Sequence, residues 1–194
     1  MAWPFLYFPG DRLSTAELTG ARLDGDLVEV GEAYMPADAV ETRELRAASL
    51  RPHVPTAVAV IRESAAWVHG AVPDPPPRHI VQRLSPTRVH VARDPRTIYR
   101  DQRIGADAVV RIAGVWVATP ARTLGDLVRA AHAGEPVSAH IEALLAWRPQ
   151  IATEALAALE RGPSLHHKRP AIAYLRALVE GEGMPQDDVT RYTS

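Results

Sequence analysis

The sequence predicts an α+β fold in which strands dominate the first part of the chain and helices the last part. β-prone runs separated by glycine and aspartate turns are frequent up to residue 118, whereas apolar residues at helical spacing dominate after it. The two patterns meet where a strand runs directly into a helix. The predicted units are a small N-terminal unit (1–37), a mixed α/β domain that ends in helices (38–183) and a flexible tail (184–194).

This junction predicts a hairpin followed by a well-capped helix. Val109–Ile112 and Val115–Ala118 are β-prone and are separated by Ala113-Gly114, a two-residue turn in which glycine can take a positive φ. Thr119 is the expected N-cap, and Pro120 is the expected first helical residue. The apolar face of the helix is formed by residues at i, i+3, i+4 and i+7: Leu124, Leu127, Val128 and Ala131.

Composition limits the classes of function. The 194 residues contain no cysteine, which excludes disulfides, thiolate catalysis and cysteine-based metal sites and fits a cytoplasmic protein. No apolar run approaches about 18 residues, so we expect no membrane span. The phosphate-loop, G-x-S-x-G, H-E-x-x-H and dinucleotide fingerprints are missing, so we expect no enzyme, no metal and no cofactor.

Charge is unevenly distributed although the net charge is only −1. Residues 1–50 contain 4 Arg and 9 acids, a balance of −5, whereas residues 51–103 contain 9 Arg and 4 acids, a balance of +5. Several of these arginines accompany expected strands over 80–84, 88–91 and 97–99. They form either a solvated sheet face or a surface for nucleic acid or an acidic partner.

The N-terminal unit begins with an aromatic stretch. Trp3, Phe5 and Tyr7 alternate as on a strand with one aromatic face. We expect that face to cover the core; the alternative is an exposed patch that docks a partner.

A helix and a hairpin are expected after these aromatics. Ser14 and Glu17 predict a capping box for a helix through Arg22, and a hairpin with its turn at Gly31-Glu32 follows. A helix followed by a two-stranded wing is the end of a winged helix, so we interpret residues 1–37 as a degenerate winged-helix unit. The acidic charge of the unit leaves a second interpretation open, a small docking subdomain.

The remaining elements are expected over 38–53 (a helix with Val40 on its inner side), 57–61 (a strand), 62–69 (a helix), and 138–147, 151–160 and 169–180 (three amphipathic helices). Ser64 and His69 lie five residues apart on one helix, about 140° around its axis, so they do not form a nucleophile–base pair. Capping and packing are the expected roles of both side chains.

Two blocks taken together resemble one protein family. VIRESAAWVHG at residues 60–70 and GVWVATPARTLGDL at residues 114–127 are similar, in order and spacing, to the AbiEi-like antitoxin and transcriptional-regulator family of bacteria. Residues 13–36 occupy the place of that family's winged helix, so the resemblance covers most of residues 13–135. The residues that match the motifs are Ser64, His69, Thr119, Arg122, Thr123 and Asp126.

The resemblance implies the antitoxin of a type IV toxin–antitoxin module. Such a protein represses its own operon through the winged helix and neutralises a nucleotidyltransferase-like toxin through its C-terminal domain. A related group continues into a Vsr-like endonuclease domain with clustered acids; Asp187-Asp188 cannot replace that domain, so we expect no nuclease. We expect the motif residues to be structural: caps, a buried histidine, and an Asp126 that bridges Arg122 and Arg129.

The leading hypothesis is therefore a non-enzymatic antitoxin-like regulator that reads operator DNA with the helix Ser14–Arg22. The residues expected to contact DNA are Arg12, Thr15, Thr19, Arg22, Arg83 and Arg88. A homodimer is one expected arrangement, because palindromic operators need two copies. The alternative is a protein-interaction module that binds a toxin or another partner without sequence-specific DNA binding.

Overall fold

The structure, a computed structural model, describes residues 5–89 and 94–182. Its elements are α1 (Thr15–Leu23), β1 (Leu27–Val30), β2 (Ala33–Pro36), α2 (Arg43–Ser49), β3 (Val58–Val60), α3 (Arg62–His69), β4 (His79–Arg83), β5 (Thr97–Arg100), the 3-10 turn η1 (Ala106–Ala108), β6 (Val109–Ile112), β7 (Val115–Ala118), α4 (Pro120–His132), α5 (Ser138–Trp147), α6 (Ile151–Arg161) and α7 (Lys168–Glu182). This order confirms the predicted α+β class.

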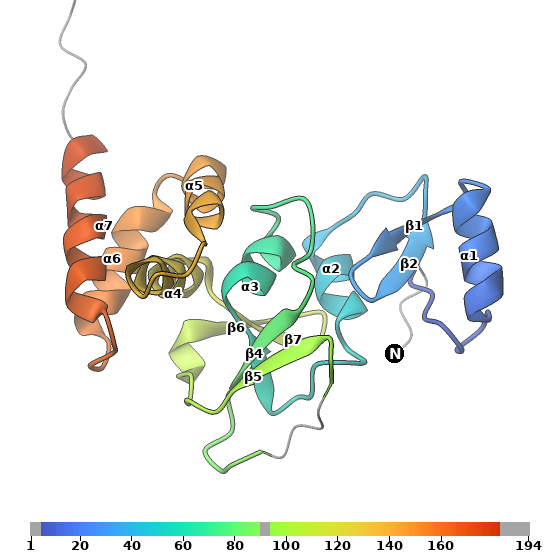
Figure 1. Ribbon diagram of the computed structural model, residues 1–194, viewed down its shortest axis with the longest axis horizontal. Helices are drawn as coiled ribbons and strands as arrows, with labels where there is room; N and C mark the ends of the chain where they lie inside the picture. The colour runs from blue at the N-terminus through green and yellow to red at the C-terminus, as the bar shows by residue number, and fades with distance from the viewer. Residues whose placement is uncertain (1–4, 90–93, 183–194) are drawn as a thin grey trace, which may run out of the picture.

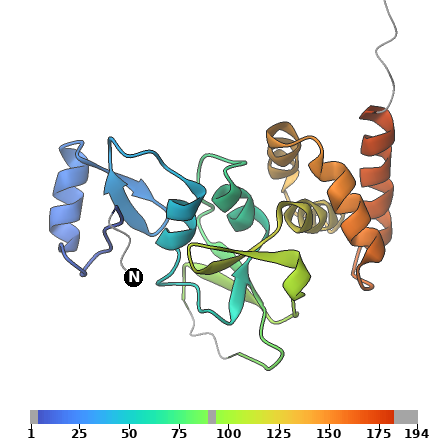
Figure 2. The ribbon, with the colours of Figure 1, turned by 180° about the vertical axis from the view of Figure 1, so that it is seen from behind.

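The molecule has three regions along its long axis (Figures 1 and 2). Helix α1 and the hairpin β1–β2 lie at one end, the five-stranded sheet with α2 and α3 lies in the middle, and α4–α7 lie at the other end. The strand-to-helix junction at the end of β7 therefore connects the sheet to the helical region.

The central sheet is mixed, with the strand order β5-β4-β3-β7-β6. Strand β3 lies in the centre, antiparallel to β4 and parallel to β7. All its residues are buried, which explains its short, uninterrupted apolar sequence. Strands β6 and β7 are joined by Ala113 and Gly114 with φ of 47° and 88°, and positive φ at both positions is what a type I′ hairpin turn requires.

Two hydrophobic cores meet at α3. The first lies around the sheet, α2 and α3 and contains the fully buried Trp67. The second lies among α4–α7 and contains Leu127 and Leu144, and Ala66 of α3 belongs to it. Because neighbouring residues of one short helix serve both cores, the sheet and the helical region are packed together rather than merely linked.

The hairpin β1–β2 packs against the first core, whereas α1 does not. Val30 and Met35 are buried in that core, and a Cβ on Gly31 would lie 2.8 Å from the ring of Trp67. By contrast, the buried residue of α1 is Leu18, and it belongs to neither of the two cores. The boundary after residue 37 and the winged-helix interpretation stay predictions.

The aromatic stretch at the N-terminus departs from the prediction at Phe5. The backbone of Tyr7 exchanges two hydrogen bonds of 2.9 Å with that of Tyr34 beside the hairpin. In this register Leu6 is buried, whereas Phe5 is 54% exposed. The prediction that the aromatic face covers the core is therefore wrong at Phe5, because alternation predicts two faces but not which one points inward. Trp3 lies outside the described residues.

Two other expectations need correction. The helix expected over 38–53 begins only at Arg43, because the side chain of Thr42 accepts the Leu45 N–H and caps it there. Val40, expected on the inner side, precedes the helix and is 79% exposed. The strand expected over 88–91 does not begin at Arg88, and the rest of it lies largely outside the described residues.

Candidate functional site

Three motif residues converge on the carbonyl end of β7. His69 Nε2 donates a hydrogen bond of 2.8 Å to the carbonyl of Ala118, which ties α3 to that strand. The Thr123 hydroxyl, at the start of α4, donates to the Thr119 carbonyl at 2.9 Å. The Thr119 hydroxyl in turn accepts the Arg122 N–H at 3.3 Å, as the predicted N-cap does. These contacts hold the junction between sheet and helices in one geometry.

His69 sits in this junction as a neutral side chain. Burial lowers the pKa of His69, and the nearby Arg43 and Arg148 guanidinium groups lower it further, against the opposing effect of the bond to Ala118. The ring also stacks on Trp147 of α5 at 6.3 Å between centroids. The neutral imidazole is therefore a packing and hydrogen-bonding group here.

Ser64 does not join this junction and does not cap its own helix. Its hydroxyl oxygen accepts the Ile80 N–H of β4 at 3.0 Å. Helix α3 begins after Ile61 with no side-chain cap. The expectation of a capping role for Ser64 is wrong, because a residue inside the first turn that faces the sheet finds the unpaired donor of β4 instead.

Asp126 forms the predicted bridge between two arginines. Its carboxylate accepts from Arg122 Nε at 2.7 Å and from Arg129 Nη1 at 2.9 Å, and it is only 7% exposed. Arg129 Nε also donates to the carbonyl of His166 at 2.7 Å, just before α7. The cluster therefore fixes α4 to the start of α7.

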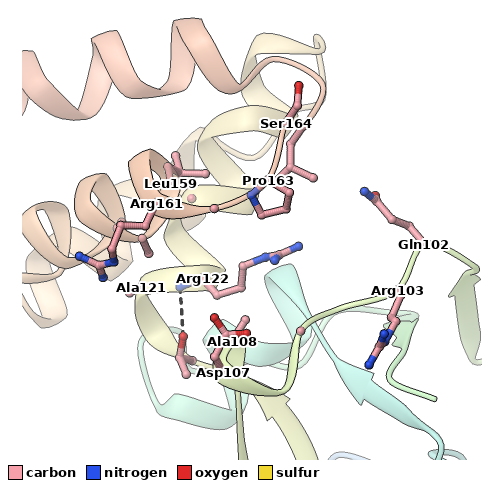
Figure 3. A pocket seen from close by; sticks show the side chains of 17 residues that line it. Gln102, Arg103, Asp107, Ala108, Ala121, Arg122, Leu159, Arg161, Pro163 and Ser164 are labelled. Atoms are coloured by element: carbon pink, nitrogen blue, oxygen red, sulfur yellow. Dashed lines mark hydrogen bonds between the residues drawn. The ribbon is translucent and has the colours of Figure 1, made fainter. Parts of the chain in front are cut away.

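A groove runs beside this cluster, between the sheet and the helical region. It consists of two adjoining cavities of about 400 Å³ and 230 Å³, and Gln102 and Arg122 line both. Figure 3 shows the larger cavity, with Arg122 pointing between Pro163 and Ser164 on one side and Gln102 and Arg103 on the other.

A second ion cluster lies across the smaller cavity. Arg62, almost fully buried, donates to both Glu135 oxygens at 3.1 and 2.7 Å and to Glu63 at 3.1 Å. Arg100 lies 3.9 Å from Glu135. The Arg62 guanidinium holds the pKa of Glu135 below its ordinary value. Sequence reasoning missed Arg62 and Glu135, and the one available signal was an arginine placed directly after a buried strand.

The residues expected to contact DNA do not form one surface. On or beside α1, Arg12 and Thr15 are exposed, while the Thr19 hydroxyl donates to the Thr15 carbonyl at 2.7 Å. Arg22 Nε lies 3.4 Å from a carboxylate oxygen of Glu29 on β1, and both side chains are largely exposed.

The other two predicted contacts lie in the central region. Arg83 Nε donates to the carbonyl of Asp101, and its Nη1 donates to the carbonyls of Ser85 and Pro86, so this guanidinium is largely committed to the loop after β4. Arg88 Nε lies 3.4 Å from Asp101, and its side chain is 87% exposed. The structure thus brings Arg83 and Arg88 together around Asp101, on different elements from α1.

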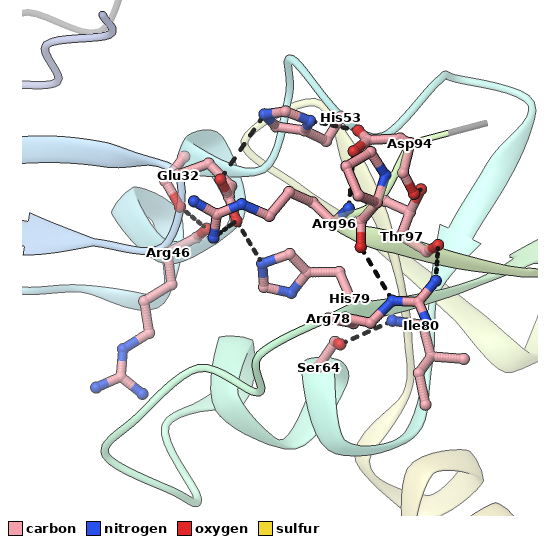
Figure 4. A network of polar contacts seen from close by, with 12 residues as sticks. Glu32, Arg46, His53, Ser64, Arg78, His79, Ile80, Asp94, Arg96 and Thr97 are labelled. Carbon is pink, nitrogen blue, oxygen red and sulfur yellow. Dashed lines mark hydrogen bonds and ion pairs between the residues drawn. The ribbon is translucent and has the colours of Figure 1, made fainter. Parts of the chain in front are cut away.

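The hairpin tip is anchored by a polar network (Figure 4). Glu32 lies 3.4 Å from His79, 3.8 Å from His53 and 3.3 Å from Arg96. His53 also contacts Asp94 at 2.5 Å, which lowers the pKa of that carboxyl. The pKa of His79 is lowered, chiefly by burial and further by His53 and Arg96, against the raising effect of Glu32. The network connects β1–β2 to β4 and to the segment before β5.

In the part of the chain that the structure describes, no three His, Asp or Glu side chains are grouped to hold a metal ion. Over the same residues, no helix combines the length and the apolar character needed to cross a bilayer.

The sequence of this chain matches one family of known proteins. Residues 57–180, more than half of the chain, match the family model described as the AbiEi antitoxin C-terminal domain. The match includes both motif blocks and all the residues of the junction. Among solved structures, the chain is similar to the RV2827C protein from Mycobacterium tuberculosis, with a TM-score of 0.35 and 16% identity over 84% of this chain and 70% of that one. No curated protein matches it.

Proposed function

The chain belongs to the AbiEi antitoxin family, and on that premise we propose that it is a non-enzymatic, cytoplasmic antitoxin that binds its own operator DNA and counteracts a nucleotidyltransferase-like toxin. The family membership supports the general antitoxin role. The DNA-binding role is supported by one observation, the exposed helix α1 beside the hairpin β1–β2.

Helix α1 has the properties of a helix that enters the major groove of DNA. Its N-terminus is fixed by the complete capping box between Ser14 and Glu17, so the helix is preorganised. It is anchored through Leu18, which leaves most of its surface free. Thr15 and Arg22 on that surface are the side chains that we propose to lie near base edges, and Arg12 the one that contacts phosphate. Arg83 and Arg88 would extend the footprint on the sheet region.

The test of this placement is the substitution Arg22→Ala in a binding assay with the upstream region of its own gene. Loss of a base or phosphate contact by an arginine costs about 1–3 kcal/mol, so we expect affinity to fall about tenfold. Arg43→Ala on α2 is the matched control, because Arg43 is likewise an exposed arginine paired with a carboxylate. Unchanged affinity for Arg22→Ala would remove α1 as the recognition helix.

A protein-interaction module is the second candidate, and the charge of −5 over residues 1–50 favours it. Acidic surfaces repel a phosphate backbone and attract basic partners. In this case the chain would relieve growth arrest when it is co-expressed with the neighbouring toxin but would show no preference for its upstream DNA. Operator binding, by two copies on a palindromic site, would instead favour the regulator.

A further inference from the structure

The smaller cavity of the groove contains a buried donor without a partner. Gln82 lines this cavity and is 3% exposed, and its Nε2 has no hydrogen-bond partner among the described residues. Arg62 Nε, at the same cavity, is also unpartnered within residues 5–89 and 94–182. Because native proteins satisfy nearly all buried polar groups, such a pair of donors points to a ligand that accepts from them.

The backbone is strained at the same place. In the described chain, three residues other than glycine have a positive φ, and two of them, Arg62 at 58° and His167 at 56°, line this cavity. The third, Ala113, belongs to the hairpin turn, where that conformation is required. Strain of this kind concentrates at functional sites, where the surrounding structure holds a side chain in a particular position.

The groove carries a surplus of positive charge. Six arginines and three carboxylates line the two cavities, and Glu63 behind Arg62 offsets one further charge. Around the smaller cavity alone, four arginines face two lining carboxylates and Glu63, a surplus of about one positive charge, which favours an anionic group there. Arginine forks are also well suited to phosphate oxygens.

The larger cavity has a different character. Small and apolar residues form much of its wall: Ala121, Gly125, Ala155, Ala158, Leu159 and Pro163. Thr119 and Ser164 add hydroxyl groups at its edge. A wall of this kind accepts a flat organic body and orients it with a few polar contacts. Arg122 lies between the two cavities, because it lines both.

We propose that this groove binds a nucleoside phosphate, with its phosphate among Arg62, Gln82 and Arg100 and its base against the apolar wall of the larger cavity. The two volumes together fall in the range of small-molecule sites. This site is separate from α1, so it does not depend on operator binding.

The test is calorimetric titration of the full chain with adenosine monophosphate, compared with ribose 5-phosphate, adenosine and succinate. We expect saturable binding of adenosine monophosphate with a Kd below about 1 mM. Arg100→Gln, at a side chain 46% exposed, should weaken it about tenfold. Gln82→Met removes the buried donor with little change of volume and should also weaken binding.

Arg176→Gln is the matched control, because Arg176 is 53% exposed and pairs with Glu160 outside the groove. It should leave binding unchanged. If Gln82→Met does not fold, the exposed Arg100→Gln carries the test. No saturation at about 10 mM adenosine monophosphate, or equally tight binding of succinate, would overturn the proposal. Equal weakening by Arg176→Gln would do so as well, and ribose 5-phosphate binding as tightly as the nucleotide would overturn the role of the apolar wall.

Discussion

Asp126→Asn tests whether the arginine-bridging carboxylate holds α4 to the start of α7. The substitution keeps the shape of the side chain but removes the charge that Arg122 and Arg129 share at 2.7 and 2.9 Å. Each charge-assisted hydrogen bond contributes about 1.5–3 kcal/mol when it is buried. The two arginine side chains are 17% and 15% exposed, so water compensates part of the loss. We therefore expect Asp126→Asn to lower the free energy of unfolding by about 3 kcal/mol.

Urea unfolding followed by circular dichroism measures this loss. For a chain of this size, with a slope of about 2–3 kcal/mol per molar urea, the midpoint should fall by about 1–1.5 M. Glu160→Gln is the control, because Glu160 is 45% exposed and its bond to Arg176 is a surface pair worth less than about 1 kcal/mol. A midpoint for Asp126→Asn that differs from the wild type by no more than the control would refute the reasoning.

Two further predictions concern stability. The pKa values of His69 and His79 are both lowered in the folded chain, chiefly by burial, so the unfolded chain binds more protons below about pH 6.5. The free energy of unfolding should therefore keep the full contribution of these two histidines above that pH and lose it progressively below it. Equal urea midpoints at pH 7.5 and 5.5 would contradict this. Gly31→Ala should destabilise the fold by about 1–3 kcal/mol, because its Cβ meets Trp67 and its φ is 55°. Gly25→Ala, with φ 85° and open space around its Cβ, should cost less, and equal thermal midpoints for the two variants would show that the hairpin tip does not pack as described.

Elements with local start and stop signals were predictable from the sequence. Thr119 and Pro120 predict the start of α4 to the residue, and Ser14 with Glu17 predicts the capping box of α1. The turn Ala113-Gly114 likewise predicts the hairpin β6–β7. In each case the deciding interaction joins residues a few positions apart, so the sequence pattern contains it.

The features that depend on distant partners were not predictable. The parallel pairing of β3 with β7 joins residues more than fifty positions apart, and no local pattern specifies it. The same limit explains why Leu6 rather than Phe5 is buried, since the register is set by Tyr34. The groove was missed because Gln82 and Glu135 acquire their roles only when β4 meets the helical region.

The most direct test of the proposed function is binding of the purified chain to a labelled fragment of its own upstream region, against an unrelated fragment of equal length, at two salt concentrations. The account predicts a clear preference for the upstream fragment, with affinities for both fragments falling as salt rises, because each neutralised phosphate releases counterions. Equal affinity for the two fragments at low salt would contradict operator binding and leave the protein-interaction module as the better explanation.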